Sequence, residues 1–301
     1  MKPMDRRRFL QLAAGTGLAA LGGWGGVRAL GAAEGGGPVI SQQPRRAPAV
    51  FVSHGSPMVG IETDPYTDAL ARFGAAEAPG AILVVSAHWE AGGPIRVTSA
   101  DRHGTIHDFG GFPRALYEVR YPATGAPALA AEVSERLGAA GFPATLDAGR
   151  GLDHGAWVPL LRMKPRADVP VVAVSLPDPR TPDELLRIGE ALRPLRDAGV
   201  LILGSGGIVH NLRILEWREK FAPAADWARG FDEWVAERLA GDRDLRAFRE
   251  APSGRLAVPT SEHFDPVFVV LGASTPGDVH EPIFTGFHYG TLSMRTFALR
   301  S

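Results

Sequence analysis

Two short stretches decide the predicted fold: Pro48–Pro57 reads PAVFVSHGSP, and Ala81–Glu90 reads AILVVSAHWE. Each is an apolar run that stops at a serine and a histidine, with glycine, serine or alanine alongside. Short apolar runs bounded by Gly or Pro are typical of buried strands in a parallel sheet. We therefore expect strands at Ala49–Ser53 and Ala81–Ser86, each followed by a histidine.

Strand and helix patterns alternate along the rest of the chain. Two further apolar runs, Val169–Leu176 and Gly199–Leu203, predict strands, and Ile283–Ala298 predicts one or two more around Gly290. The segments predicted to be helical are Pro127–Ala140, Thr181–Asp197, Trp227–Leu239 and Leu245–Glu250. This alternation predicts an α/β fold in which helices flank a central mixed, largely parallel sheet, in a single compact catalytic domain over residues 48–301.

Composition excludes several classes of protein. The 301 residues are 45% hydrophobic and 22% charged, which suits a globular protein with a sizeable core. The formal net charge is −1, and no stripe of Lys and Arg follows the N-terminus, so nucleic acid is not an expected partner. The sequence shows no apolar surface stripe from which an oligomeric state could be predicted. The chain has no cysteine, which excludes disulfides, thiolate metal ligands and a cysteine nucleophile.

The N-terminus has the layout of an export signal. Residues 1–33 begin with basic side chains, continue with an apolar stretch over Phe9–Leu21, and end in small residues. The run Arg6–Leu10 reads RRRFL and matches the twin-arginine pattern. The apolar stretch is shorter than the roughly 20 residues that a membrane span needs. We therefore expect an exported, periplasmic protein without a membrane span after cleavage, with residues 34–47 as a linker.

Histidines recur at the ends of predicted strands. His54 and His88 follow their strands directly, and His210 follows the strand and glycine turn of LILGSGGIVHNL. Ligands of open α/β sheets bind at the carboxyl ends of strands, so these three side chains are expected to point into one crevice. His154 lies in GLDHGAWVPL, and His263 lies at the predicted start of a helix with Ser261 as its N-cap.

The dispersed histidines favour a catalytic metal site. Neutral imidazoles without thiolates suit zinc, iron, copper or nickel. The His-Glu-x-x-His motif of helical zinc proteases is absent. Scattered ligands leave coordination positions open, as catalytic sites require.

The segment His103–Pro122, HGTIHDFGGFPRALYEVRYP, fits no regular element well. Long irregular segments with several aromatic residues often form lids or pocket walls. Its aromatic side chains are either plain core or one side of a flat slot for an aromatic ring. The residues predicted to bind substrate are His107, Phe109, Phe112, Tyr117 and, beside the second strand, Trp89.

Six motifs taken together resemble a known family. In chain order they are HGSP, SAHW, TIHDFGGFP, DHGAWVPL, GSGGIVHNLR and EHFDP, spread from about Pro48 to Met294. The set resembles the class III extradiol ring-opening dioxygenases, and within them the DOPA-dioxygenase-like group of the protocatechuate 4,5-dioxygenase β-subunit superfamily. The resemblance implies a compact α/β fold with one mononuclear metal site. It also implies cleavage of a catechol ring by O₂, with both oxygen atoms entering the product.

The resemblance also implies roles for individual residues. His54, His88 and His263 match the metal ligands, although a glutamate holds the third position in the wider superfamily and Glu262 is adjacent here. His210 matches the acid/base histidine, which is sometimes treated as a fourth ligand. His154 matches a further catalytic histidine. The metal implied is Fe(II), and Zn(II) is the other metal found in this group.

Two alternatives stay open at the level of sequence. The same histidines could serve a zinc-dependent hydrolase that uses a bound hydroxide. The chain could also be a non-catalytic binding member, since a fold does not fix a function. The export signal departs from the group, whose members are usually cytoplasmic, and favours an extracellular phenolic substrate.

Overall fold

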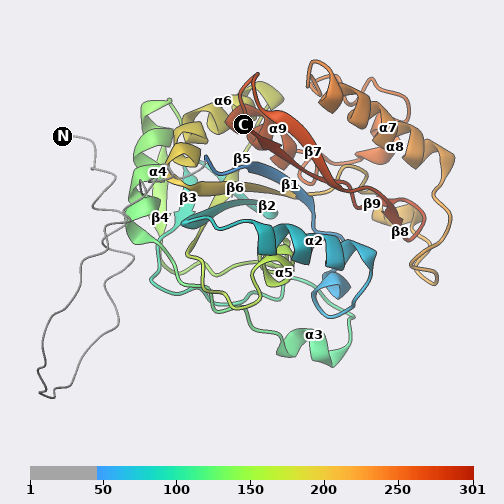
Figure 1. Ribbon diagram of the computed structural model, residues 1–301, viewed down its shortest axis with the longest axis horizontal. Helices are drawn as coiled ribbons and strands as arrows, with labels where there is room; N and C mark the ends of the chain where they lie inside the picture. Colours follow the sequence, from blue (N-terminus) through green and yellow to red (C-terminus); the bar gives the residue numbers. More distant parts are fainter. Residues whose placement is uncertain (1–45) are drawn as a thin grey trace, which may run out of the picture. The chain divides into compact units, whose positions relative to one another are not determined.

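The apolar runs that follow the N-terminal segment become neighbouring strands of one large sheet. The computed structural model describes residues 46–301, and within them eight strands form a mixed sheet (Figure 1). In spatial order they are β4 (Ala144–Asp147), β3 (Ile95–Thr98), β5 (Val171–Asp178), β2 (Ala81–Gly92), β6 (Val200–Gly206), β1 (Ala49–Ser53), β10 (Thr296–Arg300) and β7 (Val279–Phe284). The central strands β5, β2, β6 and β1 are parallel, whereas β3 and β10 run antiparallel to their inner neighbours. The predicted mixed, largely parallel sheet is confirmed.

Helices cover both faces of this sheet. On one face lie α4 (Pro127–Ala139), α6 (Pro182–Leu192) and α9 (Pro266–Ala273), and on the other lie α2 (Pro65–Ala76) and α5 (His154–Met163) (Figure 1). The remaining elements are η1 (Pro57–Gly60), α3 (Arg114–Glu118), η2 (Arg193–Ala198), η3 (Leu212–Ile214), α7 (Asp226–Ala240), α8 (Gly254–Ala257) and the β8 (Phe287–His288) and β9 (Leu292–Ser293) hairpin. Three layers around one sheet make a single α/β domain.

Most predicted elements occur where the pattern places them, with differences at some ends. The strand β1 occupies the predicted residues, while β2 continues six residues beyond Ser86 and so contains His88. The C-terminal region Ile283–Ala298 holds more strands than predicted, because it contributes to β7, β8, β9 and β10.

Two local predictions are wrong. Leu245–Glu250 forms a series of turns and no helix: Phe248 donates to Leu245 and Glu250 to Ala247, bonds that each span three residues, and Phe248 packs on Phe264. The helix expected near His263 begins later, at Pro266, and its N-cap residue is Asp265 and not Ser261. The Ser261 carbonyl instead accepts from the backbone N–H groups of Phe264 and Asp265, which closes a turn around His263.

Two glycines, Gly206 at the end of β6 and Gly207 directly after it, explain how this turn reaches the sheet. A Cβ at Gly206 would lie 2.0 Å from the carbonyl oxygen of His263, so only glycine fits there. That same carbonyl accepts from the Gly207 N–H at 2.7 Å. The motif GSGG, which lacks the spacing of a phosphate-binding loop, therefore serves close packing of the His263 turn against the end of β6.

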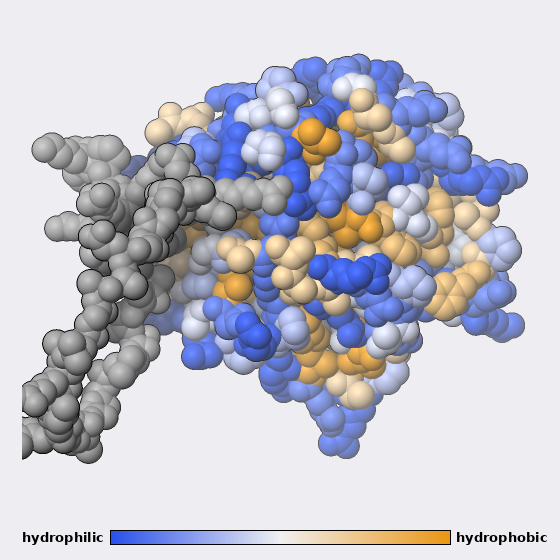
Figure 2. All heavy atoms as spheres, in the orientation of Figure 1, coloured by the Kyte–Doolittle hydropathy of each residue, from blue (hydrophilic) through white to orange (hydrophobic). Residues whose placement is uncertain are grey.

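Apolar side chains are concentrated in the core around the sheet. Figure 2 shows polar residues over most of one face, with apolar residues in smaller patches. Among residues 46–301, no helix is long and apolar enough to cross a membrane. The predicted export signal (1–33) and nearly all of the predicted linker (34–47) lie outside the described residues.

Candidate metal centre and active site

The carboxyl ends of β1, β2 and β6 meet at one edge of the sheet and bring distant histidines together. His54 follows β1, and its backbone N–H donates to the carbonyl of Gly206 at the end of β6. His88 lies in β2 where its pairing with β5 shifts register, between Val85 and Glu90. An irregularity of this kind redirects side chains and is common next to active sites. The structure brings His54 and His88 together, although His88 lies within β2 and not after its last residue.

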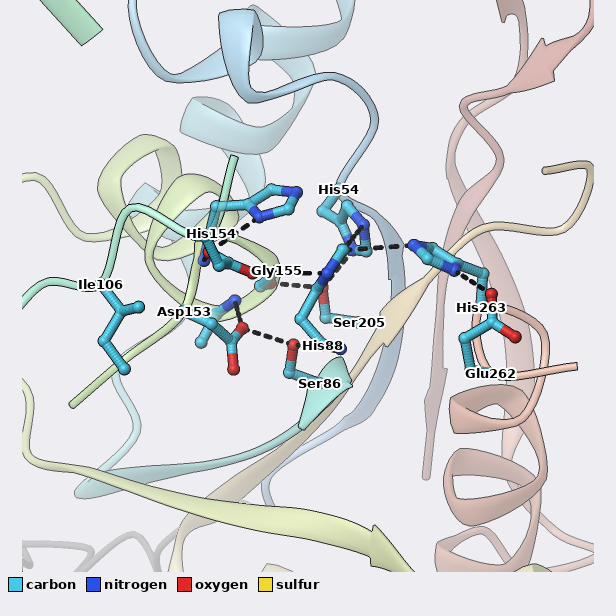
Figure 3. Close-up of polar contacts among 12 residues, drawn as sticks. His54, Ser86, His88, Ile106, Asp153, His154, Gly155, Ser205, Glu262 and His263 are labelled. Atoms are coloured by element: carbon cyan, nitrogen blue, oxygen red, sulfur yellow. Dashed lines mark hydrogen bonds and ion pairs between the residues drawn. The ribbon is translucent and has the colours of Figure 1, made fainter. Parts of the chain in front are cut away.

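The Nε2 atoms of three histidines converge on one point. His88 Nε2 lies 3.1 Å from His54 Nε2 and 3.2 Å from His263 Nε2. Figure 3 shows the three rings facing one another from different parts of the chain. Two nitrogen ligands at about 2.1 Å from one metal ion are separated by roughly 3.0–3.4 Å for ordinary coordination angles. The spacing therefore matches that of ligands around a single ion.

Hydrogen bonding at the other nitrogen fixes the tautomer of His54. Its Nδ1 lies 3.1 Å from Ser205 Oγ. The Ser205 hydroxyl donates to the carbonyl of Gly155, so the serine oxygen must accept from the ring. The proton of His54 is therefore on Nδ1, and Nε2 presents a lone pair.

A carboxylate lies beside the outer nitrogen of each of the other two rings. His88 Nδ1 lies 3.4 Å from a carboxylate oxygen of Asp108, and His263 Nδ1 lies 3.0 Å from Glu262 Oε1. Glu262 accepts from the His263 ring, which therefore carries its proton on Nδ1. The contact of His88 with Asp108 is an ion-pair distance and no hydrogen bond, but the negative charge of the carboxylate favours the same tautomer. Three lone pairs within 3.2 Å of a neighbour repel one another unless a cation lies between them. Oxygen partners on the outer nitrogen are also what metal-ligating histidines usually have. The residues therefore fit a bound metal ion.

Burial keeps these rings neutral. Loss of solvent lowers the pKa of His54 and His263 well below its usual value, and nearby histidines lower it further. Burial likewise lowers the pKa of His88 to about 3. Neutral imidazole is the form that binds metal, so the three rings are ready to ligate at neutral pH.

Glu262 lies beside the three-histidine cluster as a partner of His263. Its Oε1 accepts from His263 Nδ1 and, at 2.8 Å, from the hydroxyl of Thr260. The other ring nitrogen, His263 Nε2, therefore faces His88. Of the two adjacent candidates for third ligand, the geometry brings His263 to the other histidines.

The two remaining predicted site histidines flank the cluster on separate sides. The His210 ring stacks on His263, with centroids 3.5 Å apart and planes 7° from parallel. Burial lowers the pKa of His210 to about 4, although the charge of Glu262 opposes that shift. The His154 ring, at the first residue of α5, has its centroid 4.0 Å from that of His88.

Sequence reasoning missed the residues that hold the rings. Asp108 lies near the outer nitrogens of both His88 and His154, at 3.4 Å and 3.0 Å. Ser205 holds His54 from β6. The available signal was a polar residue inside each motif: Asp108 in TIHDFGGFP and Ser205 in GSGG.

Four of the five predicted substrate residues form one aromatic wall, defined here as His107, Phe109, Phe112 and Tyr117. Phe109 is its centre, with ring centroids 5.2 Å from Tyr117 and 5.4 Å from Phe112. The His107 ring lies 5.7 Å from that of Phe109, and its Nε2 donates to the Val119 carbonyl. The wall reaches the histidine cluster through Phe109, whose ring centroid lies 5.6 Å from that of His154.

Trp89 lies apart from this wall. Its side chain is buried in the core, and the guanidinium of Arg150 lies 5.1 Å from its ring centroid. Successive side chains of a strand point to opposite faces, so Trp89 faces away when His88 faces the cluster.

The fold and site together define a class: a single-domain α/β protein with a histidine-rich site suited to one metal ion. The comparisons with known proteins make the assignment specific. Residues 48–297 match the family described as the catalytic LigB subunit of aromatic ring-opening dioxygenase, and the chain belongs to that family. Members of this family generally use a metal. The chain is therefore an extradiol ring-opening dioxygenase, an enzyme that acts on a small molecule with O₂.

Curated relatives agree with this assignment. A protein from Escherichia coli (strain K12) named 4,5-DOPA dioxygenase extradiol is 41% identical over 265 residues, which cover 85% of this chain and 95% of the relative. A protein of the same name from Beta vulgaris is 36% identical and covers 83% and 96%. The crystal structure of an uncharacterized Escherichia coli K12 protein superposes with a TM-score of 0.72 at 35% identity, covering 84% of this chain and 99% of that one.

Proposed function

We propose that this dioxygenase uses Fe(II), held by His54, His88 and His263, to open the ring of a catechol. The observation that supports it best is the convergence of three Nε2 lone pairs whose outer nitrogens each lie near an oxygen. When bound, ferrous iron would supply the charge that acidifies the catechol hydroxyls and the redox capacity for reaction with O₂. Zinc fits the same nitrogen donors but has no redox chemistry.

His210 is the proposed acid/base residue. It lies against His263, and no hydrogen bond joins its ring nitrogens to other residues in the described part of the chain. A neutral imidazole there can take a proton from a catechol hydroxyl and return it as the ring opens. His154, beside His88, is proposed to orient the substrate or O₂.

The aromatic wall is proposed to hold the substrate ring. Phe109 meets its neighbours edge-on or tilted, an arrangement that leaves apolar ring surface for a further aromatic group. Its contact with His154 places this surface next to the histidine cluster. A catechol can then lie against the wall with its two hydroxyls toward the cluster.

Oxygen uptake tests the proposal. The protein without residues 1–33 would be purified without air, loaded with Fe(II) or Zn(II), and given a panel of catechols in an oxygen electrode. We expect one O₂ consumed per catechol with Fe(II) only, and a product with a new visible absorption. A protein that holds Fe(II) yet consumes no O₂ with any catechol would contradict the proposal. Turnover with Zn(II) would contradict the choice of metal.

We further propose that the chain is exported to the periplasm by the twin-arginine pathway. Support comes from the sequence alone, in the run of Arg6, Arg7, Arg8, Phe9 and Leu10. Replacing Arg6, Arg7 and Arg8 with lysine should trap the protein inside the cell. Periplasmic recovery of that variant at the normal level would contradict the proposal.

A further inference from the structure

One carboxylate, that of Asp108, connects three functionally separate parts of the site. Its Oδ1 accepts from the backbone N–H of His154 at 2.9 Å and lies 3.0 Å from Nδ1 of the same residue. Its Oδ2 lies 3.4 Å from Nδ1 of His88. Asp108 also directly precedes Phe109, the centre of the aromatic wall. No other carboxylate in residues 46–301 lies within ion-pair distance of both rings.

We propose that Asp108 is a positioning residue that sets the tautomers of His88 and His154 together. Both contacts are ion-pair distances, and the Nδ1 of His154 has no aligned hydrogen-bond partner. The negative charge of an ionised carboxylate beside each Nδ1 still favours the tautomer that carries its proton there, so each ring presents an unprotonated Nε2. For His88 this is the nitrogen that faces His54 and His263. For His154 it leaves an acceptor nitrogen on the ring beside His88.

The backbone contact adds a second role. His154 is the first residue of α5, so its backbone N–H has no acceptor within the helix. The Asp108 carboxylate supplies that acceptor. This contact fastens the loop that bears Phe109 to the helix that bears His154. The distance between the aromatic wall and the histidine cluster is thereby fixed by the same side chain that orients the rings.

The variant Asp108→Asn separates this role from general packing. An asparagine is neutral, with one carbonyl oxygen and one NH₂ group, so its oxygen can face only one of the two Nδ1 atoms. The NH₂ group would face the other ring and favour the tautomer with its proton on Nε2. Asp101→Asn is the matched control, because Asp101 is exposed in the same connection and forms no ion pair with a histidine of residues 46–301.

The experiment reads ring tautomers by ¹⁵N NMR of histidine-labelled, metal-free protein, and Zn(II) affinity by competition with a chelator. We expect the Nδ1–H form of His88 and His154 in the wild type. In Asp108→Asn we expect one of the two rings to switch, with a Zn(II) dissociation constant raised about 10–100-fold. The Asp101→Asn control should keep the wild-type tautomers and affinity.

Two results would overturn the proposal. One is the Nε2–H form of His154 in the wild type, a result that does not depend on whether any variant folds. The other is Asp108→Asn with the tautomers and Zn(II) affinity of the control. The inference rests on the proposed metal site, but neither readout requires turnover. Failure of the catechol assignment would therefore appear in oxygen uptake alone and leave these results unchanged.

Discussion

His263 Nε2 lies 3.2 Å from His88 Nε2, although 175 positions separate the two residues in the chain. Two contacts hold the turn that bears His263. The carbonyl of His263 accepts from the backbone N–H of Gly207, directly after β6. The carboxylate of Asp265 pairs with the guanidinium of Arg180 at 2.6 Å. A turn outside the helix, fastened to the sheet on one side and by a buried ion pair on the other, therefore completes the proposed metal site.

The identity of the third ligand gives the first prediction. His263→Ala removes a converging Nε2 and should weaken Fe(II) or Zn(II) binding by more than about 100-fold. Glu262→Gln leaves that nitrogen in place and keeps an acceptor oxygen for His263 Nδ1 but loses the negative charge, so binding should weaken by about 10–100-fold at most. Chelator competition on the two variants measures both. The reverse order of the two losses would identify Glu262 as the ligand.

The second prediction separates acid/base chemistry from metal binding. His210→Ala should lower kcat by roughly 10²–10⁴-fold, the range that a positioned acid/base group supplies. Metal content should stay close to that of the wild type, because the ring stacks on His263 and does not converge with the three Nε2 atoms. Near-normal turnover of a metal-loaded His210→Ala protein would refute the assigned role.

The third prediction concerns the aromatic wall. Phe109→Ala removes the ring that joins the wall to His154, and one aromatic pair contributes about 0.5–1.5 kcal/mol. We expect KM for the catechol to rise about 2–10-fold, with unchanged metal affinity. Phe142→Ala is a suitable control, because Phe142 packs against Arg187 instead. Equal KM values for the two variants would exclude the wall from substrate binding.

The fourth prediction is loss of stability in mild acid. Burial lowers the pKa of His88 to about 3 and of His210 and His288 to about 4, and that of His54 and His263 falls well below its usual value. The unfolded chain therefore binds more protons than the folded one below about pH 6.5. Each such histidine destabilises the metal-free protein by up to about 1.4 kcal/mol per pH unit between about pH 6.5 and 4.

Thermal unfolding of the metal-free protein at pH 7.5, 6.0 and 5.0 measures this loss. The midpoint should fall steadily with pH, and Zn(II) at pH 7.5 should raise it, because a ligand that binds only the folded state stabilises it. A midpoint that stays constant from pH 7.5 to 5.0 would show that these histidines are not buried as neutral rings.

Sequence predicted the sheet well because its central strands are apolar runs with clear ends. It also indicated that His54 and His88 would meet, since the carboxyl ends of parallel strands share an edge, although His88 lies inside β2. The strand and helix pattern did not predict the turn that bears His263, because this turn depends on packing against Gly206, a contact between distant segments; only the family resemblance indicated His263 as a ligand. Asp108 was missed for the same reason: its partners lie in β2 and α5, and nothing local indicates that they meet.

The most direct test is a crystal structure of the protein loaded with Fe(II) without air, with data collected at the iron absorption edge. The account predicts one anomalous peak about 2.1 Å from the Nε2 atoms of His54, His88 and His263. A peak bound to the Glu262 carboxylate in place of His263, or at a site away from these three histidines, would contradict it.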